Sequence, residues 1–191
     1  MEQYNKQNIR KMMLDKRKTM NVVDVSMKSD VICRKLMKRF SSLSTFVLYV
    51  AIGNEVSLTI LLKYLESNFN SYLLPRYNHD NGCYELVAIQ SLEHDSIIGK
   101  YAIREPRADL TALDCKARCA ENLTWIIPGV AFSKNGTRLG RGGGFYDRLL
   151  NNVKGLKIGV AYDWQIKNYL PSNDNDIGVN EVITATQVLR F

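Results

Sequence analysis

The sequence has few histidines, prolines and cysteines, and it has no long hydrophobic run. Of its 191 residues, two are histidine, four are proline and four are cysteine. With only His79 and His94 available, neither a Ser-His-Asp triad nor a Cys/His metal cage is easily built. The longest uncharged apolar runs, at 44–52 and 123–132, are far shorter than the ~20 residues of a membrane-spanning helix. This excludes a helical membrane protein and the common histidine-based catalysts.

The few cysteines also carry information about the compartment. They are Cys33, Cys83, Cys115 and Cys119. The last pair is spaced C-x3-C, without a nearby histidine pair or a second cysteine pair, which is a poor zinc pattern. The first 18 residues lack the apolar core of a secretory signal. We therefore expect reduced thiols in a cytoplasmic protein.

The charge is strongly basic for a chain of this size. Net charge is +7, hydrophobic residues make up 46% and charged residues 24%. These values are typical of a globular protein, and the length predicts a single domain over residues 1–191. An excess of positive charge suits nucleic acid, an acidic membrane surface or small anionic ligands. Composition alone leaves all three partners open.

The N-terminal segment predicts a basic amphipathic helix over residues 3–20. Its apolar residues fall within about 100° of a helical wheel, the width of a normal buried stripe. Three basic residues cluster on the adjacent edge, at the boundary between this stripe and the polar face, where they either snorkel to solvent or bind a ligand. The apolar residues are Ile9, Met12, Met13 and Met20, and the basic residues are Lys6, Arg10 and Arg17.

Further along, helical and strand patterns alternate. Two helices are predicted at 25–40, with Val31, Ile32, Leu36 and Phe40 inward, and at 57–66. Strands are predicted at 46–52, 71–77 (ended by Pro75), 82–89, 123–132 and 157–162, with an edge strand at 181–189. Alternation of this kind predicts an α/β fold: a mostly parallel, Rossmann-like sheet with helices on both faces. Ligands of such sheets bind beyond the carboxyl ends of the strands.

The segment 128–150 is the richest in chemistry. It holds six of the twelve glycines, five of them within 136–144, and connects the most hydrophobic strand to an apolar helix start at 145–150. Glycines let backbone N–H groups approach a ligand closely, and a helix N-terminus favours an anion. Arg138, Arg141 and Arg148 bracket the loop with donors suited to phosphate. A phosphate-binding loop is therefore one hypothesis, and an ordinary structural turn is the other.

Familiar nucleotide motifs do not match this loop. There is no G-x4-G-K-[ST], and after Gly140 and Gly142 the third glycine of G-x-G-x-x-G falls on Phe145. Asp147 lies in the first turn of the expected helix, where carboxylates commonly cap. Beside a phosphate loop it could instead hold a magnesium ion on an ATP triphosphate.

The stretch 138–147, R-L-G-R-G-G-G-F-Y-D, preceded by P-G-V-A-F at 128–132, resembles the signature of the 5-formyltetrahydrofolate cyclo-ligase family, also called 5,10-methenyltetrahydrofolate synthetases. Weaker elements of that family follow in the same order over nearly the whole chain. They are K-x3-R at Lys6 and Arg10, a strand ending before a glutamate at 49–55, P-R-Y at 75–77, I-x-E-P at 103–106 and P-x-N-x-N-D at 171–176, followed by Thr184.

The resemblance implies a reaction. Enzymes of this family close 5-formyltetrahydrofolate to 5,10-methenyltetrahydrofolate, with ATP as co-substrate and Mg2+ as cofactor, and release ADP and phosphate. The γ-phosphoryl group passes to the formyl oxygen, and the nitrogen at position 10 then attacks within the same molecule. Such an intramolecular attack is strongly favoured, so the protein mainly positions and activates. No Ser, Cys or His nucleophile is needed.

The resemblance also implies site residues. ATP binding falls to Lys6, Arg10, Arg138, Leu139, Gly140, Arg141, Gly142, Gly143, Gly144, Phe145 and Tyr146, so that the N-terminal helix contributes to the nucleotide site. Folate binding falls to Val50, Glu55, Arg141, Gly142, Gly143, Gly144 and Phe145, with Glu55 on the polar pterin edge. The magnesium ligands are Asp147 and Asp176, and the catalytic residues are Arg141 and Tyr146.

Three positions depart from the family pattern. Gly143 stands where some members have Lys, Phe145 where Tyr is common, and Asn175 where many have His. The main alternative function is a basic nucleic-acid-binding protein without catalytic activity, and another is an inactive domain that binds a phosphorylated metabolite. The bases are spread along the chain without an aromatic-interleaved motif, so we favour a monomeric enzyme that acts on small molecules and binds neither nucleic acid nor membrane.

Overall fold

The computed structural model describes residues 5–39, 45–68, 70–80, 82–99, 103–113 and 121–191. Four α-helices are present in these ranges: α1 (Lys6–Lys18), α2 (Val22–Arg39), α3 (Thr59–Ser67) and α4 (Phe145–Leu149). The first three lie close to the predicted helices, while Phe40 lies outside the described residues. The fourth is a single short turn, so its dipole is small.

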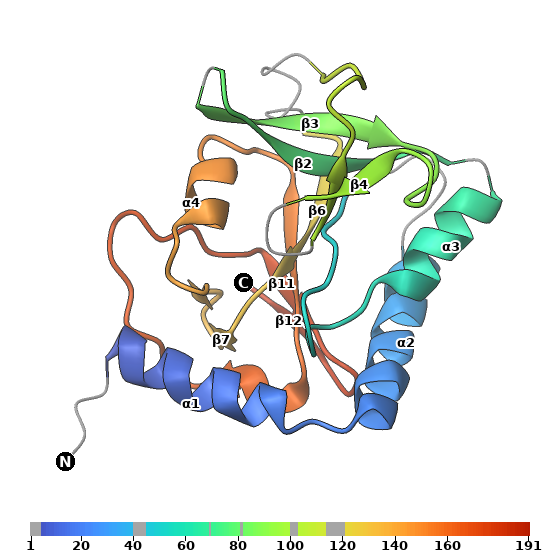
Figure 1. Ribbon diagram of the computed structural model, residues 1–191. Helices are drawn as coiled ribbons and strands as arrows, with labels where there is room; N and C mark the ends of the chain where they lie inside the picture. Colours follow the sequence, from blue (N-terminus) through green and yellow to red (C-terminus); the bar gives the residue numbers. More distant parts are fainter. Residues whose placement is uncertain (1–4, 40–44, 69, 81, 100–102, 114–120) are drawn as a thin grey trace.

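A seven-stranded sheet forms the centre of the molecule (Figure 1). Its spatial order is β12-β11-β9-β6-β1-β2-β3. The strands from β11 to β2 are mutually parallel, while β12 and β3 are antiparallel additions at the two edges. The bounds are β1 (Thr45–Val47), β2 (Tyr72–Asn78), β3 (Cys83–Ile89), β6 (Leu123–Pro128), β9 (Leu156–Val160), β11 (Glu181–Ile183) and β12 (Val188–Arg190). The predicted mostly parallel α/β sheet is confirmed.

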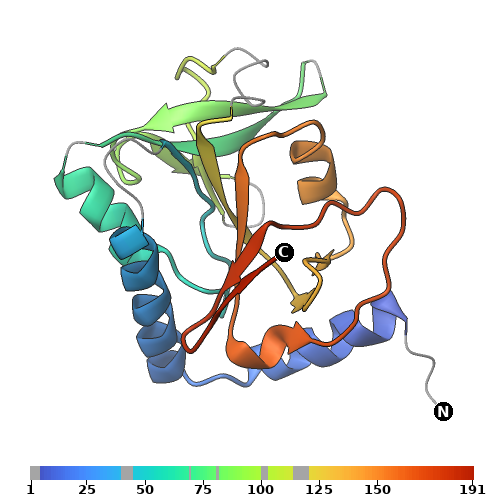
Figure 2. The same cartoon turned by 180° about the vertical axis from the view of Figure 1, so that it is seen from behind.

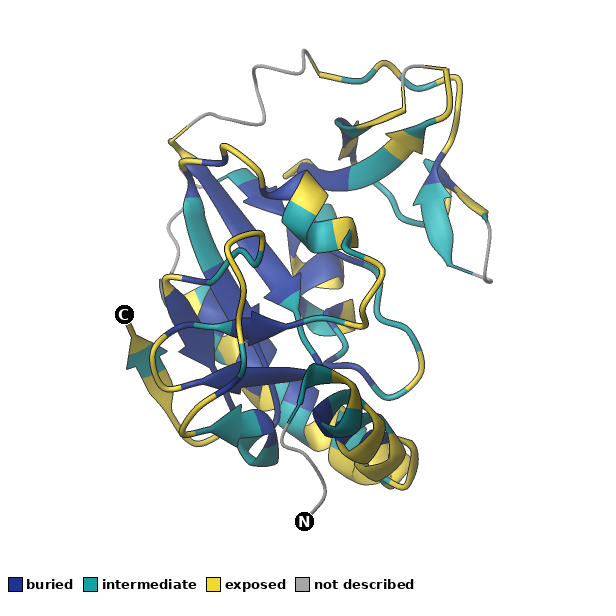
Figure 3. Cartoon of the chain, turned by 90° about the vertical axis from the view of Figure 1, so that its left-hand side faces the viewer, coloured by how far each residue is buried: buried dark blue, intermediate teal, exposed yellow. Residues whose placement is uncertain are grey.

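Helices cover both faces of this sheet, as predicted. On one face, α2 and α3 bury Ile32, Leu36 and Leu61 against the strands. On the other face, α4 and the turn after it contribute Leu149 and Val153 to a second core. Figure 3 shows the central strands buried between these layers. A parallel sheet needs apolar cover on both sides, which explains the continuous hydrophobic character of β6.

Helix α1 packs on a smaller sheet instead of the central one. This three-stranded sheet, in the order β10-β7-β8, comprises β7 (Ala131–Ser133), β8 (Arg138–Leu139) and β10 (Ile166–Lys167). Ile9 and Met13 of α1 are buried against it. Asn5 caps the helix by accepting the Asn8 N–H at 2.9 Å. In Figure 2, the segment between β10 and β11 passes the first turn of α1. A third sheet pairs β4 (Ser96–Ile98) with β5 (Arg104–Pro106).

Two predicted strands are shorter than expected. The apolar run 46–52 pairs in the sheet only as far as Val47, because the chain then turns away while Leu48 and Tyr49 stay buried. The run 123–132 forms two strands, β6 and β7, broken at Gly129. A Cβ on that glycine would lie 2.6 Å from the Phe132 ring, so the break requires glycine. In both cases the apolar run indicates that the segment is buried, but a buried segment need not be paired in a sheet.

Other expectations were wrong in detail. Met12 and Val31 are 54% and 42% exposed, because the buried stripe on each helix is narrower than the apolar pattern. Strand β2 continues through Pro75 to Asn78, since β1 has already ended and proline is tolerated where a strand has a partner on one side only. The final segment is a hairpin of β11 and β12, and only β12 is the edge strand.

The path of the chain creates a crevice between β1 and β6. These strands are parallel neighbours, with Val47 opposite Trp125. After β1 the chain leads to β2 and β3 on one side, and after β6 it leads to β9 and β11 on the other. The segments that leave the two strands therefore diverge. Such a switch point is where open α/β sheets bind ligands.

Candidate active site

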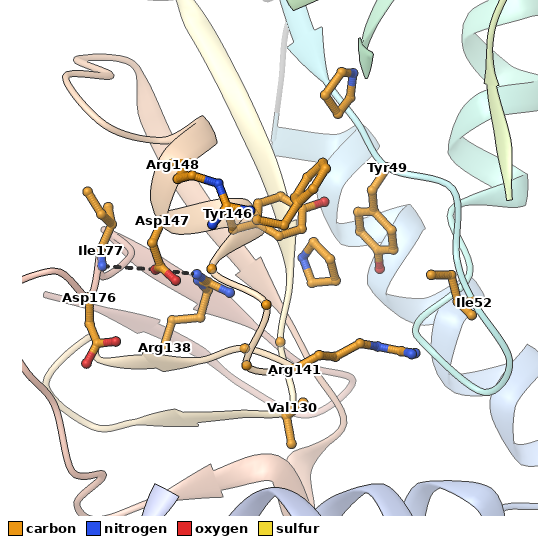
Figure 4. Close-up of a pocket in the computed structure, with 18 of the residues that line it drawn as sticks. Tyr49, Ile52, Val130, Arg138, Arg141, Tyr146, Asp147, Arg148, Asp176 and Ile177 are labelled. Carbon is orange, nitrogen blue, oxygen red and sulfur yellow. Dashed lines mark hydrogen bonds and ion pairs between the residues drawn. The ribbon is translucent and has the colours of Figure 1, made fainter. Parts of the chain in front are cut away.

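A cavity of about 1140 Å³ lies at this switch point. Its lining includes Tyr49 and Val50 after β1, Gly129 after β6, and the glycine-rich loop 140–144 (Figure 4). Ligand pockets commonly measure ~300–1,000 Å³. The cavity is therefore large enough for an extended ligand or for two ligands side by side.

One side of the cavity is polar, and we call it the basic wall. It consists of Lys6, Arg10, Arg138, Gly140, Gly142, Gly143, Gly144, Asp147 and the segment Asn173–Asp176. Two of the loop glycines have positive φ, 104° at Gly142 and 65° at Gly144, which few other residues adopt. Gly143 has open space at its Cβ position. The loop thus needs glycine at two positions, while a side chain at 143 would fit.

Helix α1 supplies two cations to the basic wall. The Nζ atom of Lys6 pairs with Asp176, and Nε of Arg10 donates to the Gly140 carbonyl at 2.8 Å. Both basic side chains therefore lie at the boundary between helix and core, where the helical wheel put them, and they tie α1 to two other segments of the cavity wall. The acceptors of both cations are groups of the protein itself.

Arg138 is held differently from the other cations. Its side chain is 2% exposed, and Nη2 donates to Asp147 Oδ1 at 2.7 Å. Its guanidinium lies 5.3 Å from the centre of the Tyr146 ring, and its Nε has no hydrogen-bond partner among the described residues. Burial raises the pKa of Tyr146, so that hydroxyl stays protonated at neutral pH and can donate a hydrogen bond.

The two predicted magnesium ligands lie beside each other. Asp147 Oδ1 also accepts the N–H of Ile177, the neighbour of Asp176, at 3.3 Å. Asp176 Oδ2 accepts from Lys6 and from the Asn173 N–H. Partial burial raises the pKa of Asp176, but these hydrogen bonds and the charges of Lys6 and Arg138 outweigh it and lower the pKa.

These carboxylates could supply only some of the ligands of a magnesium ion. Within the described residues, no three His, Cys, Asp or Glu side chains gather closely enough to hold a metal alone. Each aspartate keeps one oxygen, Oδ1 of Asp176 and Oδ2 of Asp147, outside the hydrogen bonds above. Mg2+ is usually held by one or two carboxylates, waters and substrate phosphates. The pair therefore fits a magnesium ion that arrives with a phosphate ligand.

Glu55 is the acidic centre on the opposite side of the cavity. It is 7% exposed. Its Oε1 accepts from Arg141 at 3.0 and 3.2 Å and from Arg17 at 3.3 Å, and its Oε2 accepts the Ile52 N–H at 3.0 Å. In Figure 4, Arg141 extends from the glycine loop toward Ile52. This pairing links the loop to the turn after β1.

The remaining surface is largely hydrophobic, and we call it the apolar wall. It consists of Tyr49, Val50, Leu74, Pro75, Tyr77, Ile103 and Phe145. The Phe145 ring meets Tyr84 and Tyr146 at centroid distances of 4.5 and 5.0 Å. Tyr49 donates its hydroxyl to the Val56 carbonyl at 2.6 Å, and burial raises its pKa well above the usual value. Flat rings and aliphatic groups here suit a planar or aromatic ligand.

The structure brings nearly all the expected site residues to this one cavity. The exception is Leu139, which is buried in the core beneath α1 and does not line it. Thr184 also lies elsewhere, where it donates to Asp163. Sequence analysis missed Tyr49 as a lining residue and Arg17 as a partner of Glu55. The helical spacing of Arg17 from Lys6 and Arg10 was the available signal.

The fold and the cavity together define an α/β protein with a ligand site at its strand-end switch point, basic on one side and apolar on the other. A sequence model of the 5-formyltetrahydrofolate cyclo-ligase family matches residues 2–185. The chain therefore belongs to the 5-formyltetrahydrofolate cyclo-ligase family and is an enzyme of the ligase class.

Individual proteins of this family are similar to the chain over most of its length. The solved structure of Aquifex aeolicus 5,10-methenyltetrahydrofolate synthetase is similar with a TM-score of 0.82 and 32% identity, covering 97% of this chain and 92% of that one. The 5-formyltetrahydrofolate cyclo-ligase of Mycoplasma genitalium is 30% identical over 172 residues, 86% of this chain and 89% of the relative. The mouse enzyme of that name is 26% identical over 144 residues, 71% and 70% of the two chains.

The membrane prediction can be compared with the structure directly. No helix within the described ranges has both the length and the apolar character needed to span a bilayer.

Proposed function

We propose that this enzyme closes 5-formyltetrahydrofolate to 5,10-methenyltetrahydrofolate and that it couples the closure to conversion of ATP to ADP and phosphate. The observation that carries the proposal is the two-sided cavity. A basic wall with two aspartates faces a carboxylate set beside an apolar wall, and both halves open into one space. A triphosphate needs cations and a metal site, as the basic wall offers. A pterin needs a hydrogen-bond acceptor and an apolar surface, as Glu55 and the apolar wall offer.

The nucleotide half is assigned to the basic wall. Lys6 and Arg10 line the cavity and would contact phosphate oxygens, to which the positive-φ glycines leave the backbone of the loop open. Asp147 and Asp176 would hold Mg2+, which would neutralise charge on the triphosphate. Arg138 keeps Asp147 in place from within the core. The predicted ATP contact of Arg138 is in this proposal an indirect one.

The folate half is assigned to Glu55 and the apolar wall. Glu55 can accept from the amino and ring N–H groups of a pterin, as carboxylates do in bidentate pairs. Val50 and Phe145 offer packing to the ring. This arrangement would place the formyl group toward the glycine loop, where Arg141 and Tyr146 lie.

The reaction then requires that the two substrates be positioned correctly and that charge on the transferring phosphoryl group be stabilised. The formyl oxygen forms a bond to the γ-phosphorus as the bond to ADP breaks, which leaves an electrophilic carbon. The nitrogen at position 10 attacks that carbon, phosphate departs with its oxygen, and the nitrogen loses its proton to water. Arg141 stabilises charge on the transferring group, and the protonated Tyr146 hydroxyl can donate to the formyl oxygen.

A direct assay tests the proposal. Purified protein is given 5-formyltetrahydrofolate, Mg2+ and ATP, and the near-ultraviolet absorbance of the methenyl product is followed together with ADP. We expect one ADP for each methenyl product and neither product when ATP or folate is omitted. Product formation without ATP would disprove the coupling, and failure to form ADP would disprove the function. A thermal shift with RNA, in place of Mg-ATP and folate, tests the nucleic-acid alternative.

The proposal includes a cytoplasmic, monomeric enzyme. Both attributes come from the sequence, and sedimentation of the purified protein would test the second.

A further inference from the structure

Glu55 has two arginine partners that differ sharply in their surroundings. Arg17 and Arg141 both donate to Oε1 of this carboxylate. The Arg17 side chain is 6% exposed, whereas the Arg141 side chain is 48% exposed. One carboxylate oxygen is thus shared by a buried cation and an open one.

Arg17 is fixed in its place. Its Nη1 also donates to the Gly129 carbonyl at 3.4 Å, and burial lowers its pKa while Glu55 opposes that shift. The amide of Asn54 donates to the carbonyls of Arg17 and Met20 at 3.0 and 3.1 Å, which ties the Glu55 turn to the end of α1. Separating Arg17 from Glu55 would leave the buried Arg17 guanidinium without its carboxylate partner, at high cost.

Arg141 is held less firmly than Arg17. It lies between Gly140 and Gly142 on the glycine loop, and the φ of 104° at Gly142 gives this loop conformations that other residues lack. Its only partner among the described residues is Glu55. Only the arginine of this pair is open to solvent, and Glu55 keeps Arg17 as a partner when Arg141 leaves, so a ligand with N–H donors can displace Arg141.

We propose that Arg141 is an exchangeable partner of Glu55, displaced by the pterin, and that Arg17 is a positioning residue that keeps the carboxylate paired and oriented after Arg141 leaves. This rests on the proposed function. The displaced Arg141 then becomes available to the phosphoryl group that is transferred. Folate binding thereby strengthens nucleotide binding, and the reverse holds to the same degree.

The test measures dissociation constants by calorimetry for 5-formyltetrahydrofolate and for a non-hydrolysable ATP analogue with Mg2+. Each constant is measured with and without the other ligand. The variants are Arg17→Met, Arg17→Lys and Arg141→Met. The control is Lys18→Met, which removes an exposed cation, paired with Asp15, from the same end of α1. Thermal unfolding verifies that each variant is folded.

We expect folate to tighten binding of the ATP analogue at least fivefold in the wild type and in Lys18→Met. Arg141→Met should lose this coupling and keep its folate affinity within threefold. Arg17→Met should weaken folate binding more than tenfold while the analogue alone binds within twofold of wild type. Arg17→Lys should recover part of the folate affinity. If Arg17→Met does not fold, Arg17→Lys is used instead. It should weaken folate binding about threefold while the analogue alone binds as in the wild type.

Other results overturn the inference. If Arg17→Met weakens both ligands equally, Arg17 only supports the fold. If coupling persists in Arg141→Met, Arg141 is not the exchanging group. A wild-type protein that makes methenyl product, but whose Arg17 variants keep wild-type folate affinity, disproves this inference alone. A wild-type protein that binds no folate disproves the proposed function and this inference with it.

Discussion

The two walls of the cavity are built by different means. In the basic wall, the charged side chains Lys6, Arg10, Arg138, Asp147 and Asp176 all have a partner within the protein. In the apolar wall, rings such as Tyr77 and Phe145 are 40% and 37% exposed. Most of the charge in the basic wall therefore already has a partner, whereas part of the apolar wall is open to solvent. A ligand of the basic wall must compete with these internal partners, and a ligand of the apolar wall mainly displaces water.

This difference has a physical consequence for selectivity. Preorganised charges favour one geometry and act most strongly on groups whose charge develops during reaction. Apolar contacts act on ground state and transition state alike, because they depend on the area removed from water. We therefore expect substitutions in the basic wall, and of Arg141 on the glycine loop, to affect turnover. Substitutions in the apolar wall should affect ligand binding.

The largest effect is expected for Arg141→Ala. Loss of its positive charge at the transferring phosphoryl group should lower kcat more than tenfold, since a single stabilising donor is often worth ~10²–10³ in rate. Steady-state kinetics measure this, with thermal unfolding as the check on folding. Arg107→Ala, which removes an exposed arginine paired with Asp109, serves as the control. Unchanged kcat would remove Arg141 from the mechanism.

A smaller effect is expected for Asp147→Asn. The amide oxygen can still accept from Arg138, so the fold should persist, but the charge offered to magnesium is lost. The Mg2+ concentration for half-maximal activity should rise several-fold. Asp109→Asn provides a matched control at an exposed site. Identical magnesium titrations for Asp147→Asn and wild type would refute the metal role.

The apolar wall is tested by Tyr77→Ala. Its ring lies 5.0 Å from Tyr84 and is partly exposed, so its removal should cost about 1 kcal/mol of ligand contact. The KM for folate should rise roughly fivefold, with kcat and the KM for ATP unchanged. A fall in kcat alone would contradict the distinction between the walls.

The smallest effect concerns pH and stability. The pKa of Asp176 is lowered in the folded protein, so its carboxylate stabilises the fold above the unfolded pKa of about 4. That contribution disappears as pH falls through the lower, folded pKa. The difference in free energy of unfolding between wild type and Asp176→Asn should therefore be constant from pH 5 to 8 and shrink below pH 4. A difference that changes between pH 5 and 8 would contradict the assigned partners.

Sequence reasoning was most successful where a local pattern determines a local structure. The alternation of helices and strands gave the parallel sheet, and the boundary position of Lys6 and Arg10 followed from helical spacing. It was less successful where hydrophobic residues serve burial without sheet pairing. The run 46–52 was predicted as a strand, yet Tyr49 and the residues after it form the cavity wall. Periodicity does not distinguish a covered strand from a covered loop.

The partners of the charged residues were the least predictable feature. Arg17 and Glu55 are 38 residues apart, and Arg141 and Glu55 are 86 apart. No pattern of short sequence spacing indicates that these residues pair. Leu139 is another example, because its place in the glycine-rich loop suggested ligand contact, whereas packing buries its side chain in the core.

By itself, the sequence determined the class of fold, the glycine-rich loop and the family, because each depends on residue types at short spacing. Only the tertiary structure decided which cation pairs with which carboxylate and where the apolar wall stands. Those arrangements depend on how β1 and β6 send the chain in opposite directions. Burial then encloses Arg17 against its carboxylate and leaves Arg141 half-exposed, because solvent access depends on the packing around each arginine and not on the residue type.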